Sequence, residues 1–507
     1  MSKRKKPLII FEMANNHMGS VSHGKEIIRQ LKEQAKNYNF EYAVKFQYRD
    51  LETFIHPDYK DRVDLKFIKR FSETRLSDED YLSLKKECEK VGFKTVCTPF
   101  DEVSAKKIKR HNYDYIKIAS CSIKDWPLLE EVCKQDMPVI ASTGGATLND
   151  VDRVVSLFHH KGIKLMLMHC VGIYPTPNDT LQLNRIDWFK ERYGDVEIGF
   201  STHESPDQLL PSAVAIGKGV MVFEKHVGFE GVDSQFELNA YSANPEQVGK
   251  WLQSIDQSLK ISGKFSEAEY TADERELSGL LELKRGVYVK DGIGKGCAFD
   301  ASQVFYSMPV HPGQMTSESF SKHNLGFVSL DSYDENDAIM DYKVEELNND
   351  NIVVSNVIHK VKGLLNQARV SVNKNSNIEL SHHYGIQSIS EIGAVLIDCI
   401  NQEYCKKIIV MIPGQSHPEH SHIRKKESFQ ILWGDLELVH DSVISQLNPG
   451  DIATINQGEK HSFSTKGGVV FEEISTTAFS NDSNYTDQDI NNNSNRKTSL
   501  TDYWMVY

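Results

Sequence analysis

The sequence lacks the features of a disulfide-stabilised or membrane-spanning protein. Its eight cysteines form no CxxC pair and no paired framework, which favours reduced thiols and a cytoplasmic location. No apolar run approaches the roughly 20 residues of a membrane span. Leu8–Ile10, which follows the basic start MSKRKKP, is too short for a signal peptide. We therefore expect a cytoplasmic protein with no membrane partner.

An excess of positive charge is also missing. The net charge is −13, whereas general nucleic-acid binders need a basic face, so we expect no nucleic-acid partner. An anionic small substrate remains open, because a few lysines inside a cleft oppose the overall sign locally. The 507 residues, 39% hydrophobic and 25% charged, are ordinary in composition but too many for one core. We expect two to four domains.

Residues 8 to about 262 alternate between short apolar runs and amphipathic helical patterns. Eight such strand–helix units over roughly 250 residues predict a (β/α)8 TIM barrel of the α/β class, rather than an open doubly wound sheet. An insertion at residues 48–75 precedes the expected helix Asp78–Lys90, and we expect it to cover the site. The predicted strands are Leu8–Phe11, Tyr42–Phe46, Lys94–Cys97, Tyr115–Ala119, Pro138–Ala141, Lys164–Met168, Val196–Phe200 and Val220–Glu224.

Polar side chains gather where these strands end, which is where such barrels place their chemistry. The runs VEIGFSTH and VMVFEKH each end in a histidine, His203 and His226. Lys45 and Lys117 lie inside predicted strands, where lysine is rarely buried unpaired, so they indicate an anionic substrate. The strand ends also carry Glu12, Gln47, Thr98, Ser120, Ser142, His169 and Ser201.

Three further residues of these runs have alternative interpretations. His169 either orients Tyr174 or packs in the core. Glu224 and Lys225 flank His226, and we interpret them as a Glu–Lys pair in the barrel wall, one of which points away from the histidine.

Seven motifs in order resemble the sialic acid (N-acetylneuraminate) synthase family: FEMANNHMGS, EYAVKFQ, CTPFD, YIKIAS, HCVGIYPTP, IGFSTH and FEKH. The resemblance covers residues 8 to about 345 and implies a C–C bond-forming transferase. Its reaction would condense phosphoenolpyruvate with an acylated aminosugar aldehyde, giving a nonulosonic (sialic-acid-like) 2-keto acid and phosphate. It also implies a barrel over residues 1–265, a small SAF (antifreeze-like, β-clip-like) domain over 283–345, and a domain-swapped homodimer.

The resemblance also implies roles for individual residues. Glu12, His203 and His226 would be catalytic, with the two histidines holding Mn2+ or Mg2+. Such a metal acts as a Lewis acid on the aldehyde, and Glu12 would transfer a proton. Phosphoenolpyruvate would be bound by Lys45, Thr98, Lys117, Ser120 and Ser201, and the sugar by Gln47, Tyr174, Asp233, Ser122 and His311.

Three positions depart from the family pattern. Family members have an acidic residue where Ser122 stands, asparagine where Gly172 stands, and an arginine that aligns best with His311. These departures suggest a different acyl-aminosugar or a related sugar. A lysine Schiff-base aldolase acting through Lys117 is the alternative enzyme class, although the paired histidines favour metal chemistry.

A second metal motif lies near the end of the chain, in an expected all-β domain over residues 391–480. Gly414, His420, His422, Glu427 and Gly434 resemble the first cupin motif, and His461 after Pro449–Gly450 resembles the second. Three histidines and one glutamate suit Mn2+, Fe2+, Ni2+ or Zn2+, and a cupin barrel with vacant ligands is the alternative.

The surrounding residues resemble the sugar-isomerase branch of the cupins. This implies either a bifunctional protein whose cupin isomerises a sugar, or a synthase regulated by a carbohydrate-binding cupin. Residues 346–390 are expected to be a connector with some structure of its own, and residues 481–507, rich in Asn, Asp and Ser, a polar tail.

Overall fold

The computed structural model describes residues 6–231, 236–263, 271–320, 326–345, 350–373, 376–479 and 482–500. The chain divides into two compact units, Met1–Tyr270 and Thr271–Tyr507, each described here by itself. Among the described residues, no helix combines the length and the apolar composition that crossing a bilayer requires.

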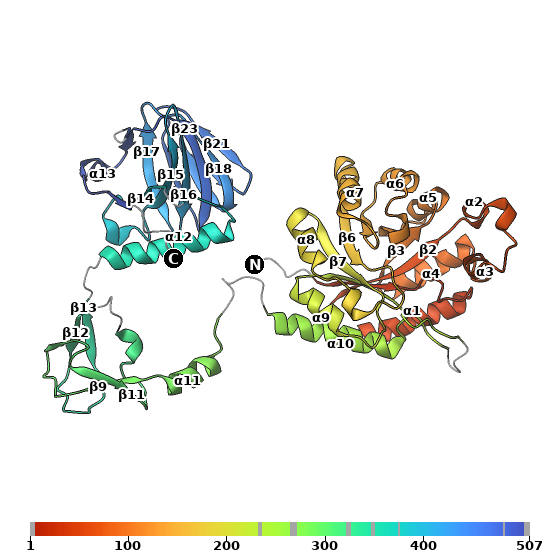
Figure 1. Cartoon of the computed structure of the whole chain (residues 1–507), viewed down its shortest axis with the longest axis horizontal. Helices are drawn as coiled ribbons and strands as arrows, with labels where there is room; N and C mark the ends of the chain where they lie inside the picture. The colour runs from red at the N-terminus through yellow and green to blue at the C-terminus, as the bar shows by residue number, and fades with distance from the viewer. Residues whose placement is uncertain are drawn as a thin grey trace. The chain divides into compact units, whose positions relative to one another are not determined.

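The first unit is a closed barrel of eight parallel strands, which confirms the predicted fold class (Figure 1). The register aligns Glu12 with Lys45 on one neighbouring strand and with His226 on the other, so the three strand ends meet at one rim. The strands, in barrel order, are β1 Leu8–Glu12, β2 Glu41–Tyr48, β3 Lys94–Pro99, β4 Tyr115–Ile118, β5 Val139–Ser142, β6 Leu165–Cys170, β7 Glu197–Thr202 and β8 Val222–His226.

Helices surround this barrel and bury the outward-facing half of each strand. Phe11, Phe223 and Trp251 belong to the core between strands and helices, whereas Ile10 and Val222 fill the barrel interior. This separation follows from the period-two alternation of side chains along a strand. The helices are α1 Val21–Ala35, α4 Asp78–Lys90, α5 Glu102–Arg110, α6 Trp126–Cys133, α7 Leu148–His160, α8 Arg185–Arg192, α9 Leu210–Gly217 and α10 Pro245–Ser262.

Three of these helices begin with a reciprocal capping box. Ser77, Thr147 and Asn244 each accept a hydrogen bond from a backbone N–H three residues on, and the third residue returns one. The caps satisfy donors that a helix leaves unpaired at its start. By contrast, α9 begins at Leu210, and its N-cap residue, Leu209, makes no side-chain bond.

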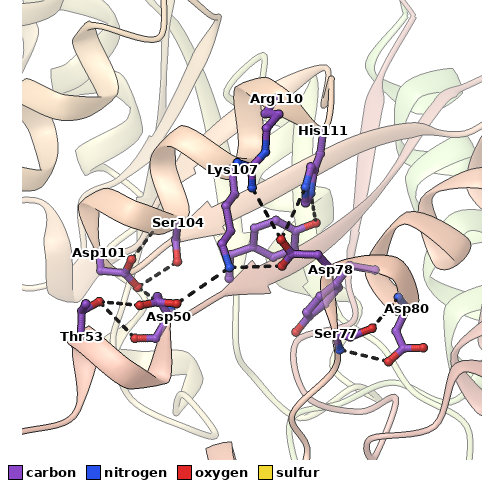
Figure 2. A network of polar contacts seen from close by, with 12 residues as sticks. Asp50, Thr53, Ser77, Asp78, Asp80, Asp101, Ser104, Lys107, Arg110 and His111 are labelled. Atoms are coloured by element: carbon purple, nitrogen blue, oxygen red, sulfur yellow. Dashed lines mark hydrogen bonds and ion pairs between the residues drawn. The ribbon is translucent and has the colours of Figure 1, made fainter.

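The insertion after β2 contains α2 Leu51–Phe54, a 3-10 turn at Pro57–Tyr59, and α3 Lys66–Glu73. Polar contacts fasten the start of this insertion to the neighbouring helices (Figure 2). Lys107 of α5 lies 3.8 Å from an Asp50 oxygen and 3.2 Å from an Asp78 oxygen. Asp101 caps α5 and also accepts the Asp50 N–H at 2.9 Å. These contacts hold the start of the insertion against α5.

The second unit begins with α11 Glu274–Leu283 and five short strands over residues 286–345. β9 pairs with β11, and β12 pairs with both β10 and β13, all antiparallel. Val287, Val289 and Phe327 lie in their small apolar core. The strands are β9 Gly286–Val289, β10 Ala298–Phe299, β11 Val304–Ser307, β12 Gly326–Ser329 and β13 Tyr342–Glu345.

The remainder folds into two antiparallel sheets, as expected for a cupin (Figure 1). Phe429, Phe463 and Phe471 pack in one apolar core, and α12 (Asp350–Gln367) belongs to a second core against the larger sheet. That sheet contains, in order, β21 Ile452–Ile455, β18 Glu427–Gly434, β23 Val469–Thr476, β16 Tyr404–Met411, β15 Ala394–Asn401, β14 Ile378–Ser381 and β25 Lys497–Leu500. The smaller contains β20 Val443–Leu447, β19 Leu436–His440, β22 His461–Ser464, β17 Ser416–His422 and β24 Ser483–Tyr485.

Two of these strands lie outside the expected cupin domain, one in the expected connector, residues 346–390, and one in the expected polar tail, residues 481–507. β14, in the expected connector, pairs with β15, and β25, in the expected tail, pairs with β14 through Ile378 and Leu500. Short helix α13 (Gln488–Asn492) also buries Ile490. Apolar residues among the polar ones thus join the sheet edge, where strand pairing satisfies their backbone groups.

Candidate functional site

An ion-pair network lies inside the barrel at the carboxyl ends of the strands. Its centre is Glu224 of β8, whose Oε1 accepts hydrogen bonds from Lys45 Nζ at 2.6 Å and from Ser201 Oγ at 3.0 Å. Lys117 Nζ lies 3.3 Å from the same oxygen. Lys45 also pairs with Glu12. These side chains are all buried, so the network accounts for lysine inside a barrel.

Burial and ion pairing shift the pKa values of the two carboxyl groups of this network in opposite directions. Burial opposes a charge on Glu224, but Lys117 and Lys45 outweigh it and lower the pKa of this carboxyl. Burial dominates at Glu12, whose pKa is raised despite Lys45. For Lys45, burial is outweighed by Glu12 and Glu224, and the pKa is raised. The network thus contains one firmly ionised carboxylate and one carboxyl that holds a proton more readily.

His203 and His226 end the neighbouring strands β7 and β8, with ring centroids 5.3 Å apart. His203 Nδ1 lies 2.9 Å from the Val171 carbonyl, which only accepts, so this nitrogen donates and Nε2 keeps its lone pair. Burial lowers the pKa of His203 to about 4, and that of His226 well below its usual range. Both rings are therefore neutral at pH 7, the form that binds a metal ion.

Aromatic and hydroxyl groups complete the surroundings of the histidines. The Tyr174 ring lies 4.1 Å from that of His203, centroid to centroid, and Tyr241 lies 5.1 Å from His226. The Thr98 Oγ1 atom is buried and has no hydrogen-bond partner within the described part of the chain. Ser120 Oγ accepts a hydrogen bond from Gly144 N–H at 3.1 Å. Hydroxyl groups of this kind, which can both donate and accept, suit an anionic or polyhydroxylated ligand.

A cavity of about 730 Å3 brings most of the predicted barrel residues together. It is large enough for two small substrates side by side, because ligand pockets span roughly 300–1,000 Å3. The predicted residues in its wall are Glu12, Lys45, Gln47, Thr98, Lys117, Ser120, Tyr174, Ser201, His203 and His226. Gly172 and His169 line it too, and His169 Nε2 bonds the Leu181 carbonyl at 2.7 Å rather than Tyr174.

Of the remaining predicted sugar-binding residues, Ser122, Asp233 and His311, only Ser122 can be compared with this cavity, and it does not line it. Ser122 is buried in a short 3-10 turn, its hydroxyl 3.8 Å from the Cys121 thiol, and its role remains a prediction. Asp233 lies outside the described residues. His311 belongs to the second unit, where its backbone N–H donates to Gln314 Oε1 at 2.8 Å, and its role also remains a prediction.

Sequence reasoning missed Glu224 as a residue of the site. It shares the interior side of β8 with His226, while Lys225 turns outward and pairs with Glu204 at 2.9 Å. The signal was present, since residues two apart on a strand face the same side. Arg49, Cys170 and Gly144 also line the cavity without having been singled out.

The second unit contains a metal-type cluster at the predicted cupin residues. One ligand atom from each of His420, His422, Glu427 and His461 lies within 4.8 Å of the others, and all four residues are buried. β17 contributes two of the histidines, and β18 and β22 the other two residues. Lys425 Nζ lies 2.5 Å from Glu427 Oε2 and 2.9 Å from Glu473 Oε1.

The unsatisfied atoms of this cluster fit a bound cation. Glu427 Oε1 and His461 Nε2 lie 2.9 Å apart, yet both are buried without an aligned hydrogen bond. Burial lowers the pKa of His420 well below its usual range and that of His422 to about 4, so these rings are neutral. The imidazole nitrogens and the carboxylate oxygen of this cluster, two of them without a hydrogen bond, make a mixed N/O ligand set for a metal ion.

Comparison with known proteins gives matches to both units. The NeuB family model matches residues 33–267, and the cupin domain model matches residues 407–474. A crystal structure from Chromobacterium violaceum ATCC 12472, provisionally named spore coat polysaccharide biosynthesis protein E, is 44% identical with a TM-score of 0.63. The match covers 67% of this chain and all of that one.

Two curated relatives are each similar over more than half of the chain. The N-acetylneuraminate-9-phosphate synthase of Drosophila melanogaster is 26% identical over 62% of this chain and 89% of its own length. The N,N'-diacetyllegionaminic acid synthase of Campylobacter jejuni is 24% identical over 66% of this chain and 99% of its own length.

Proposed function

Because the chain belongs to the NeuB family and carries a cupin domain, we propose that its barrel is a nonulosonate synthase. It condenses phosphoenolpyruvate with the aldehyde of an acylated aminosugar, giving a sialic-acid-like 2-keto acid and phosphate. The observation that carries this proposal is the buried network of Lys45, Lys117 and Glu224 beside His203 and His226 in one cavity.

The charge of the network suits phosphoenolpyruvate. Two lysines face the ionised Glu224, and the raised pKa of Glu12 favours its neutral form, so the network tends toward an excess of positive charge inside the barrel. Desolvating a small polyanion requires such compensation, together with oriented hydroxyl donors. Thr98, Ser120 and Ser201 would provide the hydroxyls.

The two neutral histidines would hold a divalent ion, Mn2+ or Mg2+, at the rim of the barrel. When bound, this ion would supply Lewis-acid polarisation of the aldehyde oxygen. Carbon 3 of phosphoenolpyruvate attacks the aldehyde carbon and forms the new C–C bond. Water then adds to carbon 2, and the C–O bond to phosphate breaks.

Glu12 would move the proton in this sequence. Burial raises the pKa of Glu12, which favours a protonated carboxyl, and this carboxyl lies beside Lys45 in the cavity. It would donate to the oxygen that becomes a hydroxyl when the C–C bond forms. Tyr174 and Gln47 would orient the sugar.

We place the reaction in the cytoplasm and expect a domain-swapped homodimer in which residues 283–345 form an SAF domain.

A panel assay tests the proposal. The full chain is supplied with phosphoenolpyruvate, Mn2+ and single aminosugars, including di-N-acetylated hexoses, and phosphate and 2-keto acid are measured. We expect stoichiometric release of both with at least one sugar, and loss of both in Lys117→Met. No phosphate release with any sugar would overturn the synthase. Release that survives complete metal chelation would overturn only the metal role.

For the cupin we propose a divalent metal held by His420, His422, Glu427 and His461, with two candidate functions. It either isomerises a sugar upstream or downstream of the condensation, or binds a carbohydrate and regulates the barrel. The double variant His420→Ala, His422→Ala distinguishes them. An isomerase loses interconversion of the sugar while the condensation rate with supplied acceptor is unchanged. A regulator loses the response of that rate to added sugar.

A further inference from the structure

Arg49, the residue after β2, is a partly buried arginine without a carboxylate partner in the described part of the chain. Its guanidinium lies between the rings of Phe71 and Phe100, 4.0 Å and 3.7 Å from their centroids. Nη2 donates to Gln47 Oε1 at 2.9 Å, while Nε is buried with no acceptor. The two aromatic faces hold the cation in place but supply no opposing charge.

Asp50, Asp101 and Glu12, three carboxylates in this part of the barrel, are engaged by other groups; Figure 2 shows the first two, and Glu12 pairs with Lys45. Asp50 accepts from Thr53 and lies 3.8 Å from Lys107. Asp101 accepts from the backbone of Asp50 and from both the N–H and the hydroxyl of Ser104. Asp50 therefore pairs with Lys107, and Asp101 caps α5. Neither forms an ion pair with Arg49 within the described residues.

The position of Arg49 indicates what the missing anion belongs to. Arg49 and Gln47 line the 730 Å3 cavity that contains Glu12 and His226, and both also line an adjoining cavity of about 560 Å3 beneath the insertion. Lys45 and Lys117, by contrast, are grouped around Glu224 at the barrel centre. The arginine is thus at the wall shared with the second cavity, and is not part of the lysine pair that would hold phosphoenolpyruvate.

We infer that the acceptor sugar carries an anionic group, a phosphate or a carboxylate, remote from its aldehyde, and that Arg49 binds this group. The inference rests on the proposed function, since it takes the cavity to receive an acceptor sugar. A guanidinium fixed between two rings presents only its edge, which matches the paired oxygens of a carboxylate or phosphate. An anion there would supply the charge that burial of Arg49 otherwise leaves uncompensated.

Three sugars that differ only at carbon 6 test the inference with the full chain and Mn2+. They are N-acetyl-D-mannosamine, its 6-phosphate, and its 6-carboxylate, N-acetyl-D-mannosaminuronate, and their binding is measured by calorimetry. We expect at least one anionic sugar to bind tenfold or more tightly than the neutral one, and the stronger of the two identifies the group. Arg49→Gln should remove this preference while leaving the affinity for phosphoenolpyruvate unchanged, and Arg49→Lys should keep part of it.

Arg185→Gln is the matched control. Arg185 lines the same cavity, is also partly buried, and lies over one ring, Phe189, at 5.3 Å, with Nη2 donating to the Ala146 carbonyl. Its variant should keep the preference for the anionic sugar.

Three results would overturn the inference: equal binding of all three sugars, an unchanged preference in Arg49→Gln, or a loss of phosphoenolpyruvate affinity in that variant. Binding requires no turnover, so a failure here is distinguishable from a failure of the condensation assay.

Discussion

Glu224 and Lys225 are consecutive residues of β8 that form ion pairs on opposite faces of the barrel wall. Glu224 joins Lys45 and Lys117 inside the barrel, whereas Lys225 pairs with Glu204 outside it and lies 5.6 Å from the Trp251 ring centroid. Both pairs are buried, but only the inner one lines the cavity. The strand thus separates a charge pair of the site from one of the wall.

Glu224→Gln should abolish most of the condensation activity. One carboxylate oxygen orders Lys45, Lys117 and Ser201, and a neutral amide cannot compensate two buried lysines. We expect kcat/KM for phosphoenolpyruvate to fall roughly 100-fold, as when an oriented electrostatic group is removed. Glu204→Gln is the control, because it breaks the outer pair. Both variants should lose on the order of 3 kcal/mol of stability. Glu204→Gln, however, should keep the wild-type KM for phosphoenolpyruvate. Equal kinetic defects in the two would contradict this assignment.

Removing cupin ligands should remove one metal ion per chain. We expect His420→Ala combined with His461→Ala to lower the divalent metal content of purified protein, measured by mass spectrometry, by one equivalent. The matched control is His440→Ala, whose cluster with Asp441 and Glu459 is more exposed. Chelation should also destabilise the second unit, by about 2.7 kcal/mol if the metal stands at 100 times its Kd. Unchanged metal content in the double variant would show that the cluster is vacant.

Gly199→Ala should destabilise the barrel. A Cβ at this position of β7 would lie 2.3 Å from Met168 Sδ and 2.8 Å from the Val222 carbonyl oxygen. The thioether is flexible, but the carbonyl belongs to the neighbouring strand and its movement would disturb the strand pairing. We expect a loss of about 1–3 kcal/mol in denaturant unfolding. Gly217→Ala, in α9 with open space around it, should be neutral or stabilising by up to about 1 kcal/mol. Similar stability of the two variants would refute this explanation.

His17 should make the first unit sensitive to acid. It is buried, Nδ1 accepts from the Gly19 N–H at 3.2 Å, and Nε2 has no partner among the described residues. Burial lowers the pKa of His17 to about 4, so the unfolded chain takes up this proton first as the pH falls. The contribution of His17 to the free energy of unfolding is complete above pH 6.5 and decreases toward pH 4. Between pH 7.5 and pH 5 it falls by about 2 kcal/mol.

The measurement is the difference in unfolding free energy between the wild type and His17→Gln at these two pH values. We expect the difference to shrink by that amount at pH 5. His160→Gln, at an exposed histidine of α7, should differ from the wild type equally at both. A difference for His17→Gln that does not change with pH would show that folding leaves the pKa of this imidazole unchanged.

Local sequence patterns predicted most of the barrel. The helix Asp78–Lys90, which begins with a capping box, has the expected bounds because its start signals lie within a few neighbouring residues. The short strands β14 and β25 at one end of the larger sheet did not emerge from composition, since their mutual pairing joins residues more than 100 positions apart.

The sequence by itself determined the eight strand–helix units, the two histidines at neighbouring strand ends and the spacing of the four cupin ligands. These follow from periodicity and motif order, which are properties of short stretches. Only the tertiary structure decided that Glu224 compensates Lys45 and Lys117, and that Arg49 lies between Phe71 and Phe100 without an acid. Charge compensation depends on which side chains meet across strands and loops, and that is set by closure of the barrel.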